Sequence, residues 1–170
     1  MSAFKDIYRN HSDMVYNLCL NYLQNKEDAE DVTQLVFVKV YQQLDKFQGK
    51  SSLKTWIYRI AVNQCLDHQK ASKRKKRFGV VRSLFAEKED QKEVTPIEMN
   101  HPGVALEDKE AVSRIFSLIN QLAPKQKIAL LLKTTEGLSG KEIGEVMNLS
   151  EKAVESLLSR ARSNLKKMLS

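Results

Sequence analysis

Turn-forming residues are scarce in this sequence, which has only 6 glycines and 3 prolines among 170 residues. That scarcity argues against an all-β protein, because many short strands need frequent turns built from these residues. No run of about 18 apolar residues occurs, so no segment is a candidate membrane span. No secretory signal is recognisable either, and we therefore expect a soluble protein located in the cytoplasm.

Side chains that bind metals or carry out catalysis are also few. Cys19 and Cys65 lie in helical apolar patterns without C-x-x-C spacing, and His11, His68 and His101 are scattered. Because zinc ligands recur at short, regular spacings, we expect no metal site and no cofactor. The cysteines are interpreted as small buried thiols in a reducing compartment. We recognise no nucleophile–base pair and no phosphate-binding loop, so an enzyme acting on a small-molecule substrate is the least favoured class.

Positive charge is abundant but unevenly distributed along the chain, whose net charge is +7. Residues 39–77 carry 11 basic and 2 acidic side chains, and residues 112–170 carry 10 and 5. The segments before and between these blocks are net acidic. This alternation predicts two modules that face nucleic acid, joined by a connecting segment. A protein of the membrane surface would need a basic amphipathic helix with an unburied apolar face, and we find none that its own domain would not bury.

The stretch 138–165 has the layout of a helix-turn-helix. Ser139 and Glu142 form an S-x-x-E capping box, Asn148 is suited to end the first helix, and Ser150 can cap the second. Gly144 lies where the two helices would cross. An ordinary helical hairpin also fits, but two capped starts with a small residue between them favour DNA binding. The outer face of the second helix has short or charged side chains suited to a DNA groove: Lys152, Glu155, Ser156, Ser159, Arg160 and Ser163.

Apolar spacing predicts helices in the N-terminal part, over 3–23, from Asn25 to about Leu44, and over 53–70. The second of these is apolar over most of its circumference, which is typical of a helix that is central in its domain or that also faces a partner. One strip along it mixes an acid, an amide and apolar groups. The pattern alone supports a central helix and a partner surface equally.

Aromatic and basic residues alternate around the start of the third helix. Such a mixture suits single-stranded nucleic acid, because cations follow the phosphates while rings stack on exposed bases. The aromatic rings could equally fill the core. The basic run 70–77, KASKRKKR, is suited to a phosphate backbone. The residues concerned are Lys46, Phe47, Lys50, Lys54, Trp56, Tyr58 and Arg59.

Helical periodicity fades between Phe78 and about Glu110, where acidic residues dominate and Pro96, Pro102 and Gly103 interrupt the chain. We interpret this segment as a flexible linker. Helices are expected again over 112–122 and from Pro124 onward, and with the helix-turn-helix they would make a four-helix domain. The predicted fold is therefore all-α, with small helical domains at 1–77 and 111–170 joined by a linker at 78–110.

The order of these parts resembles the extracytoplasmic-function sigma factors, small bacterial initiation factors of the housekeeping sigma superfamily. The resemblance covers nearly everything except the linker, and no single fragment carries it. It rests on FKDIYRNH…VYNL, DAEDVTQLVFVKVY, FQGKSSLKTWIYRIAVNQCLD and LAPKQKIALLLKTTEGLSGKEIGEVMNLSEKAVESLLSRARSNL. In that family a promoter-melting domain and a helix-turn-helix domain are joined by a linker that threads through RNA polymerase.

The resemblance implies three sets of functional residues. Contact with the largest-subunit coiled coil of core RNA polymerase is implied for Asp28, Asp31, Gln34, Phe37, Val38 and Tyr41. Capture of an unpaired −10 base and of the non-template strand is implied for Lys46, Phe47, Gln48, Gly49, Lys50, Ser51, Ser52, Lys54, Trp56, Arg59, Asn63, Lys73 and Arg74. Recognition of the −35 element in the major groove is implied for Lys141, Lys152, Glu155, Ser156, Ser159 and Arg160.

The implied mechanism involves no reaction by this chain. Core RNA polymerase would supply the chemistry, while this protein chooses promoter DNA and opens its strands. An anti-sigma factor, often membrane-bound in this family, is a further implied partner, and it would hold the protein at the inner membrane face. One departure from the family's pattern is Glu155, where many relatives have Lys or Arg. A carboxylate there cannot bind a phosphate; it could accept from a cytosine amino group or orient Arg160, which leaves the −35 sequence open.

Two other interpretations compete with this one. A conventional helix-turn-helix regulator would bind closed duplex DNA as a dimer and would use the N-terminal helices for sensing or dimerisation. It predicts a ligand cavity or a symmetric interface. An RNA-binding helical protein that uses residues 46–77 is less favoured.

Overall fold

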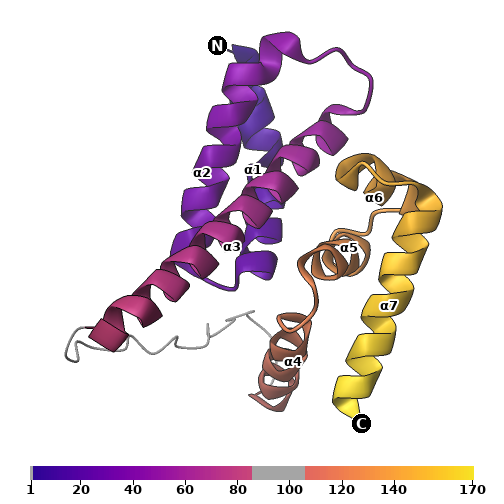
Figure 1. Ribbon diagram of the computed structural model, residues 1–170. Helices are drawn as coiled ribbons and strands as arrows, with labels where there is room; N and C mark the ends of the chain where they lie inside the picture. Colours follow the sequence, from indigo (N-terminus) through magenta and orange to yellow (C-terminus); the bar gives the residue numbers. More distant parts are fainter. Residues whose placement is uncertain (1, 86–105) are drawn as a thin grey trace.

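The computed structural model describes residues 2–85 and 106–170, and all the regular elements within these residues are helices joined by loops. Figure 1 shows three N-terminal helices beside four C-terminal ones. The predicted all-α fold is thus confirmed. The elements are α1 (Ser2–Leu23), α2 (Lys26–Gln43), the short 3₁₀ helix η1 (Leu44–Lys46), α3 (Leu53–Phe85), α4 (Leu106–Ile119), α5 (Pro124–Thr134), α6 (Gly140–Met147) and α7 (Glu151–Leu169).

Helices α1, α2 and α3 pack together as a three-helix unit, called here the N-terminal bundle. Gln24 adopts a left-handed backbone conformation (φ 54°) that reverses the chain after α1. Asn25 then caps α2 as expected, because its side-chain oxygen accepts a 2.9 Å hydrogen bond from the backbone N–H of Asp28. Val32 and Val36 of α2 are fully buried in the bundle, so α2 is the central helix that its apolar circumference indicated.

Helix α3 is 33 residues long and continues past the N-terminal bundle (Figure 1). Residues 78–85, assigned to the linker by the sequence analysis, belong to this helix. Phe78 and Leu84 are 74% and 77% exposed there, next to the basic run. The helix therefore leaves apolar and basic groups uncovered side by side, which the sequence analysis did not foresee. Residues 106–110, also assigned to the linker, belong to α4. The rest of the predicted linker, 86–105 with Pro96, Pro102 and Gly103, lies outside the described residues.

None of the helices within 2–85 and 106–170 combines the length and the apolar character that crossing a bilayer requires.

The helix-turn-helix is formed by α6 and α7, with the caps that the sequence predicted. Ser139 and Ser150 each accept a 3.1 Å hydrogen bond from a backbone N–H three residues later. Asn148 ends α6 in the left-handed conformation, at φ 56° and ψ 48°. Gly144 is needed where α6 meets the following turn, because a Cβ atom there would lie 2.6 Å from the carbonyl oxygen of Leu149.

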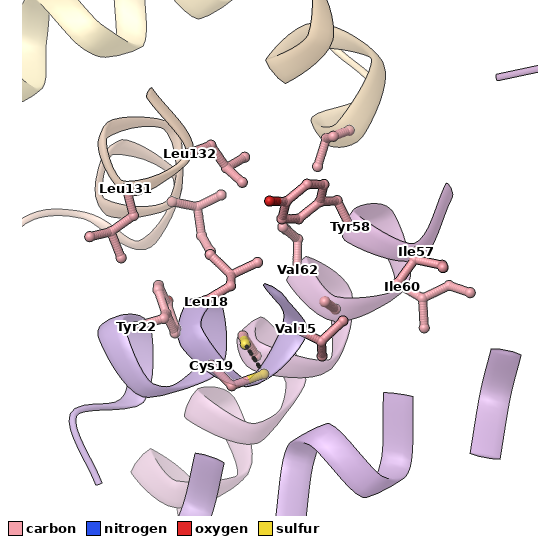
Figure 2. Close-up of a cluster of buried hydrophobic side chains, with 14 of the residues drawn as sticks. Val15, Leu18, Cys19, Tyr22, Ile57, Tyr58, Ile60, Val62, Leu131 and Leu132 are labelled. Carbon is pink, nitrogen blue, oxygen red and sulfur yellow. Dashed lines mark hydrogen bonds between the residues drawn. The ribbon is translucent and has the colours of Figure 1, made fainter. Parts of the chain in front are cut away.

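The C-terminal helices do not stand apart from the N-terminal bundle. Helix α5 packs against α1, and α6 packs against α3. Figure 2 shows Leu131 and Leu132 of α5 on the side that faces Leu18, Tyr22 and Tyr58. Buried residues of both halves thus form one continuous apolar cluster. A smaller second cluster joins α4, α5 and α7.

Substituting Gly144→Ala tests the tight turn of the helix-turn-helix. We expect a loss of about 1–3 kcal/mol in the free energy of unfolding, because the new methyl group displaces a backbone carbonyl rather than a flexible side chain. Denaturant unfolding followed by circular dichroism measures it. Gly79→Ala is the control, since that helical glycine has no atom within 4 Å of the added Cβ. The control should be neutral or stabilising by about 0.5–1 kcal/mol, and equal losses in both variants would contradict the explanation.

Candidate nucleic-acid interface

A cavity lies where the loop after η1 leads into α3. Its volume is about 170 Å³. The rings of Phe47 and Trp56 pack against each other at this cavity, with centroids 4.9 Å apart and planes inclined by 35°. Seven of the predicted −10 residues are therefore brought together: Lys46, Phe47, Gln48, Lys50, Ser51, Trp56 and Arg59.

The loop that shapes this cavity is held by short-range hydrogen bonds. The backbone N–H of Phe47 donates to the carbonyl of Leu44 at 3.1 Å, and Gly49 adopts φ 70°. Ser52 caps α3, because its hydroxyl oxygen accepts from the backbone N–H of Thr55 at 3.0 Å. Ser52 also contacts the Thr55 hydroxyl at 2.9 Å. Its hydroxyl group is thus already engaged in starting the helix, while the Lys46 and Lys50 side chains remain exposed.

Arg59 connects the cavity to the C-terminal helices. It lines the cavity from α3. Its guanidinium also donates two hydrogen bonds to the main-chain carbonyl of Glu145 in α6, from Nε at 3.2 Å and from Nη2 at 2.7 Å. A side chain that the sequence analysis assigned to DNA binding therefore also joins α3 to α6.

The neighbouring residue Tyr58 makes a second polar contact between the two halves. Its hydroxyl donates to Oε2 of Glu136 at 2.6 Å, and its ring is buried. Burial and the adjacent Glu136 carboxylate raise the pKa of Tyr58 well above its usual value. The phenol therefore stays protonated and able to donate throughout the physiological range. Lys54, also predicted to bind DNA, lies with its amine 5.9 Å from the centroid of this ring.

The remaining predicted −10 residues lie farther along α3. Asn63 is exposed one turn beyond Arg59. Lys73 and Arg74 are exposed on the part of α3 that leaves the N-terminal bundle. At 1.5 Å per residue, Lys73 is about 21 Å along the helix from Arg59. These two cations therefore form a surface separate from the cavity.

Lys127 of α5 is buried between the two halves and was missed by the sequence analysis. Its amine donates to the main-chain carbonyl of Tyr22, in the last turn of α1, where helix carbonyls lack intrahelical partners. The amine also lies 4.3 Å from the centroid of the Tyr22 ring. Burial lowers the pKa of Lys127 to about 8. Its place one turn before Leu131, on the apolar side of α5, was the signal that could have revealed it.

The predicted polymerase strip runs along α2 and is largely exposed. Asp31 and Gln34 are exposed, and Val38 and Tyr41 are 51% and 58% exposed. Apolar side chains rarely stay this exposed in a group unless a partner covers them. Leu35, at 51% exposed, adjoins the strip and was not predicted.

Three members of the predicted strip make contacts within the protein itself. Tyr41 packs edge-on against Phe4, with ring centroids 5.2 Å apart, while much of its side chain stays exposed. Phe37 is only 3% exposed and packs edge-on against Tyr8, with ring centroids 4.8 Å apart. The Phe37 ring therefore belongs to the core beneath the strip and has almost no surface that a partner could contact. Asp28 is partly covered, and its carboxylate lies 3.5 Å from Nε2 of His68.

The predicted −35 residues all project from the helix-turn-helix into solvent. Val154, Leu158 and Ala161 form the buried side of α7, which turns the opposite side outward. The arrangement therefore leaves the proposed reading face free of intramolecular cover. The exposed residues are Lys141, Lys152, Glu155, Ser156, Ser159 and Arg160.

Sequence comparisons relate both halves to one superfamily. Residues 7–75 match Sigma-70 region 2, and residues 113–165 match Sigma-70, region 4. The ECF RNA polymerase sigma factor SigW of Bacillus subtilis is 32% identical over 171 residues, which span 98% of this chain and 89% of that protein. The ECF RNA polymerase sigma-E factor of Escherichia coli is 31% identical over 160 residues, with 94% and 83% covered.

Solved structures share the fold at lower sequence identity. The sigma factor RpoE in complex with the anti-sigma factor NepR, from Bartonella quintana, has a TM-score of 0.70 at 22% identity, covering 99% of this chain and 98% of that chain. CnrH, in complex with the cytosolic domain of CnrY, has a TM-score of 0.66 at 22% identity, covering 99% and 88%. The arrangement of helices in Figure 1 is thus one that solved proteins adopt.

Stability should depend on pH through Lys127. Its pKa is about 8 in the folded protein and 10.5 ordinarily. Between these values the unfolded chain binds more protons, so stability rises with pH. We expect the free energy of unfolding of the wild type, relative to Lys127→Met, to rise by about 2 kcal/mol between pH 7.5 and 9.5.

The measurement is urea unfolding of both proteins at each pH. The two proteins share the cysteines, the tyrosines and Lys73, so the difference between them isolates the Lys127 amine. Staying below pH 10 avoids ionisation of Tyr22 and Tyr58 in the unfolded chain, which would lower stability because their folded pKa values are raised. Parallel pH profiles would show that the Lys127 amine keeps its ordinary pKa.

Proposed function

Because this chain belongs to the extracytoplasmic-function (ECF) sigma factors, it is an alternative sigma factor that directs transcription initiation, and we propose which of its surfaces perform each step. Sigma factors are non-catalytic transcription factors, and we propose that this chain likewise has no reaction of its own. It acts in the cytoplasm, where polymerase and chromosomal DNA are located. The boundaries at 77 and 111 separate its −10 and −35 parts in this proposal.

The cavity at the start of α3 is the observation that carries the −10 assignment. Extruding a base from the stack costs a few kcal/mol. Stacking on aromatic rings returns about 1–3 kcal/mol per base, and the Phe47–Trp56 pair supplies such rings. Lys46 and Lys50 stand exposed beside it, where they would neutralise phosphates on either side of the captured base.

The exposed side of α7 is proposed to read the −35 element. Glu155, Ser156, Ser159 and Arg160 occur in its first turns, the part of a recognition helix that enters the major groove. Arg160 is suited to a guanine edge and Glu155 to a cytosine amino group. Lys141 and Lys152 would contact the flanking phosphates and set the register of the helix in the groove.

The α2 strip is proposed to dock on core RNA polymerase. Asp31 and Gln34 would supply polar contacts, while Val38 and Tyr41 would supply apolar surface, which is exposed to solvent in this structure. Leu35 extends the same area. An exposed apolar surface bordered by polar groups is typical of a protein interaction site.

The packed arrangement of the two halves is proposed to be the unbound state. The −10 and −35 elements are about 25 base pairs apart, or about 85 Å along B-DNA. Arg59 at the cavity and Glu145 of α6 are in hydrogen-bonding contact, at 2.7 Å. One molecule of the protein therefore cannot bind the −10 and −35 elements at the same time until this contact opens. Docking on polymerase would supply the free energy for opening.

An anti-sigma factor is a proposed partner as well. The similar structure of the sigma factor RpoE was solved with the anti-sigma factor NepR, and that of CnrH with the cytosolic domain of CnrY. A partner of this kind that is membrane-bound would hold the present chain at the inner face of the membrane. It would act by covering the α2 strip or by stabilising the packed arrangement.

Asp31→Arg tests the polymerase surface. We expect affinity for core RNA polymerase to fall at least tenfold, because the change reverses a charge in the middle of the strip. Size-exclusion chromatography and fluorescence titration with purified core enzyme measure the complex. Asp67→Arg makes the same charge change at an exposed position of α3 and should leave binding intact. Loss of binding in both variants, or in neither, would refute the assignment.

Phe47→Leu tests the −10 cavity. We expect the reconstituted holoenzyme to open promoters about 5- to 100-fold less well, because the lost ring removes about 1–3 kcal/mol of base stacking. The readout is 2-aminopurine fluorescence in the −10 strand of a promoter that the wild-type holoenzyme transcribes in vitro. Phe116→Leu in α4 is the matched control. Unaltered opening by Phe47→Leu would assign this ring to the core alone.

A further inference from the structure

The two cysteines of this chain face each other across the N-terminal bundle. Cys19 belongs to α1 and Cys65 to α3, 46 residues apart, and the sequence contains no others. Both thiols are free and fully buried. Their sulfur atoms are 3.7 Å apart, with the Cys65 thiol donating to the Cys19 sulfur. Figure 2 marks this contact by a dashed line beneath Leu18 and Val15.

The distance between the sulfurs is close to what a covalent bond between them requires. A disulfide has a sulfur–sulfur length of about 2.05 Å, so the atoms need to approach by about 1.7 Å. In the proposal below, this approach comes from side-chain rotation and an adjustment between α1 and α3. The bond would be intramolecular and unambiguous, because neither thiol has a second partner in the chain.

We propose that Cys19 and Cys65 are a redox-active dithiol that a peroxide converts to a disulfide. The thiolate of Cys19 attacks one peroxide oxygen, the O–O bond breaks, and Cys19 becomes a sulfenic acid as the first water leaves. The Cys65 sulfur then attacks the Cys19 sulfur, the S–S bond forms, and the S–O bond breaks to release a second water. Two thiols lose two electrons and hydrogen peroxide is reduced to two waters, so the step balances.

The surroundings of the two sulfurs distinguish the attacking thiol from the resolving one. The hydrogen bond donated by Cys65 stabilises negative charge on Cys19 and lowers the pKa of Cys19, against the effect of burial, with further help from Thr33 of α2. The same hydrogen bond, together with burial, raises the pKa of Cys65. The nucleophile is the thiolate rather than the thiol, so Cys19 reacts first and Cys65 resolves.

Burial sets the rate of this reaction and its result. Peroxide reaches the thiols only through local opening of the bundle, so the folded protein should react more slowly than the unfolded chain. The product links α1 to α3 and encloses α2 and the −10 loop. A cross-link of this span restrains the unfolded chain and should raise the unfolding temperature of the oxidised protein. This chemistry is independent of the proposed promoter contacts.

The full-length reduced protein is treated with hydrogen peroxide, quenched and examined by intact mass and peptide mapping under non-reducing conditions. We expect a loss of about 2 mass units, a peptide pair joined through Cys19 and Cys65, and full reversal by dithiothreitol. Chain unfolded in guanidinium and treated identically is the positive control. Thiols that stay intact in the folded protein while the unfolded chain is oxidised would overturn the proposal, and so would oxidation only to intermolecular dimers.

Two single variants test the order of attack. With Cys65→Ser, oxidation should stop at a sulfenic acid on Cys19 that dimedone labels. With Cys19→Ser, labelling of Cys65 should be at least several-fold slower. Far-UV circular dichroism checks that both variants fold, and Cys→Ala versions replace any that do not. Equal or reversed labelling rates would refute the assignment of Cys19 as the attacking thiol. The wild-type experiment needs neither variant, and no polymerase or DNA is present in either test.

Discussion

Burial of the apolar side of α5 against α1, next to the packing of α6 against α3, is the interaction on which the remaining geometry depends. Leu131 and Leu132 are at most 1% exposed in this contact. Side chains of that size contribute about 1.5–3 kcal/mol each when fully buried, and helical groups as small as these two halves have limited cores of their own. The polar contacts made by Arg59, Tyr58 and Lys127 lie around this apolar contact and fix the position of one half relative to the other.

The same contact includes a buried amine, which makes it weaker than a contact between apolar side chains alone. Lys127 carries an ammonium group into the interface, and burial opposes its charge, as its lowered pKa shows. The Tyr22 carbonyl and ring compensate in part. Under the proposal that polymerase binding separates the two halves, this contact needs a small net free energy. A buried amine beside leucines provides that balance more readily than an all-apolar interface.

Sequence reasoning succeeded where structure is local. The caps at Ser139, Asn148 and Ser150 act over three or four residues, so their spacing alone predicts them. The residues that line the cavity at the start of α3 are also local, since they lie within 46–59, but their assignment to the −10 element came from the family resemblance and stays a prediction. The packing of α5 on α1, the burial of Lys127 and the meeting of Cys19 with Cys65 were not foreseen. They join positions 46 to 105 residues apart, and helical periodicity shows that a face is buried without showing against what.

The length of α3 relates its two ends to the geometry of DNA. The helix carries the cavity near Trp56 and the basic turn from Lys73 to Arg77 on one continuous rod. These positions are about 25–32 Å apart at 1.5 Å per residue. One turn of the double helix rises about 34 Å. A duplex lying along α3 would therefore turn nearly the same side toward the cavity and toward the cations.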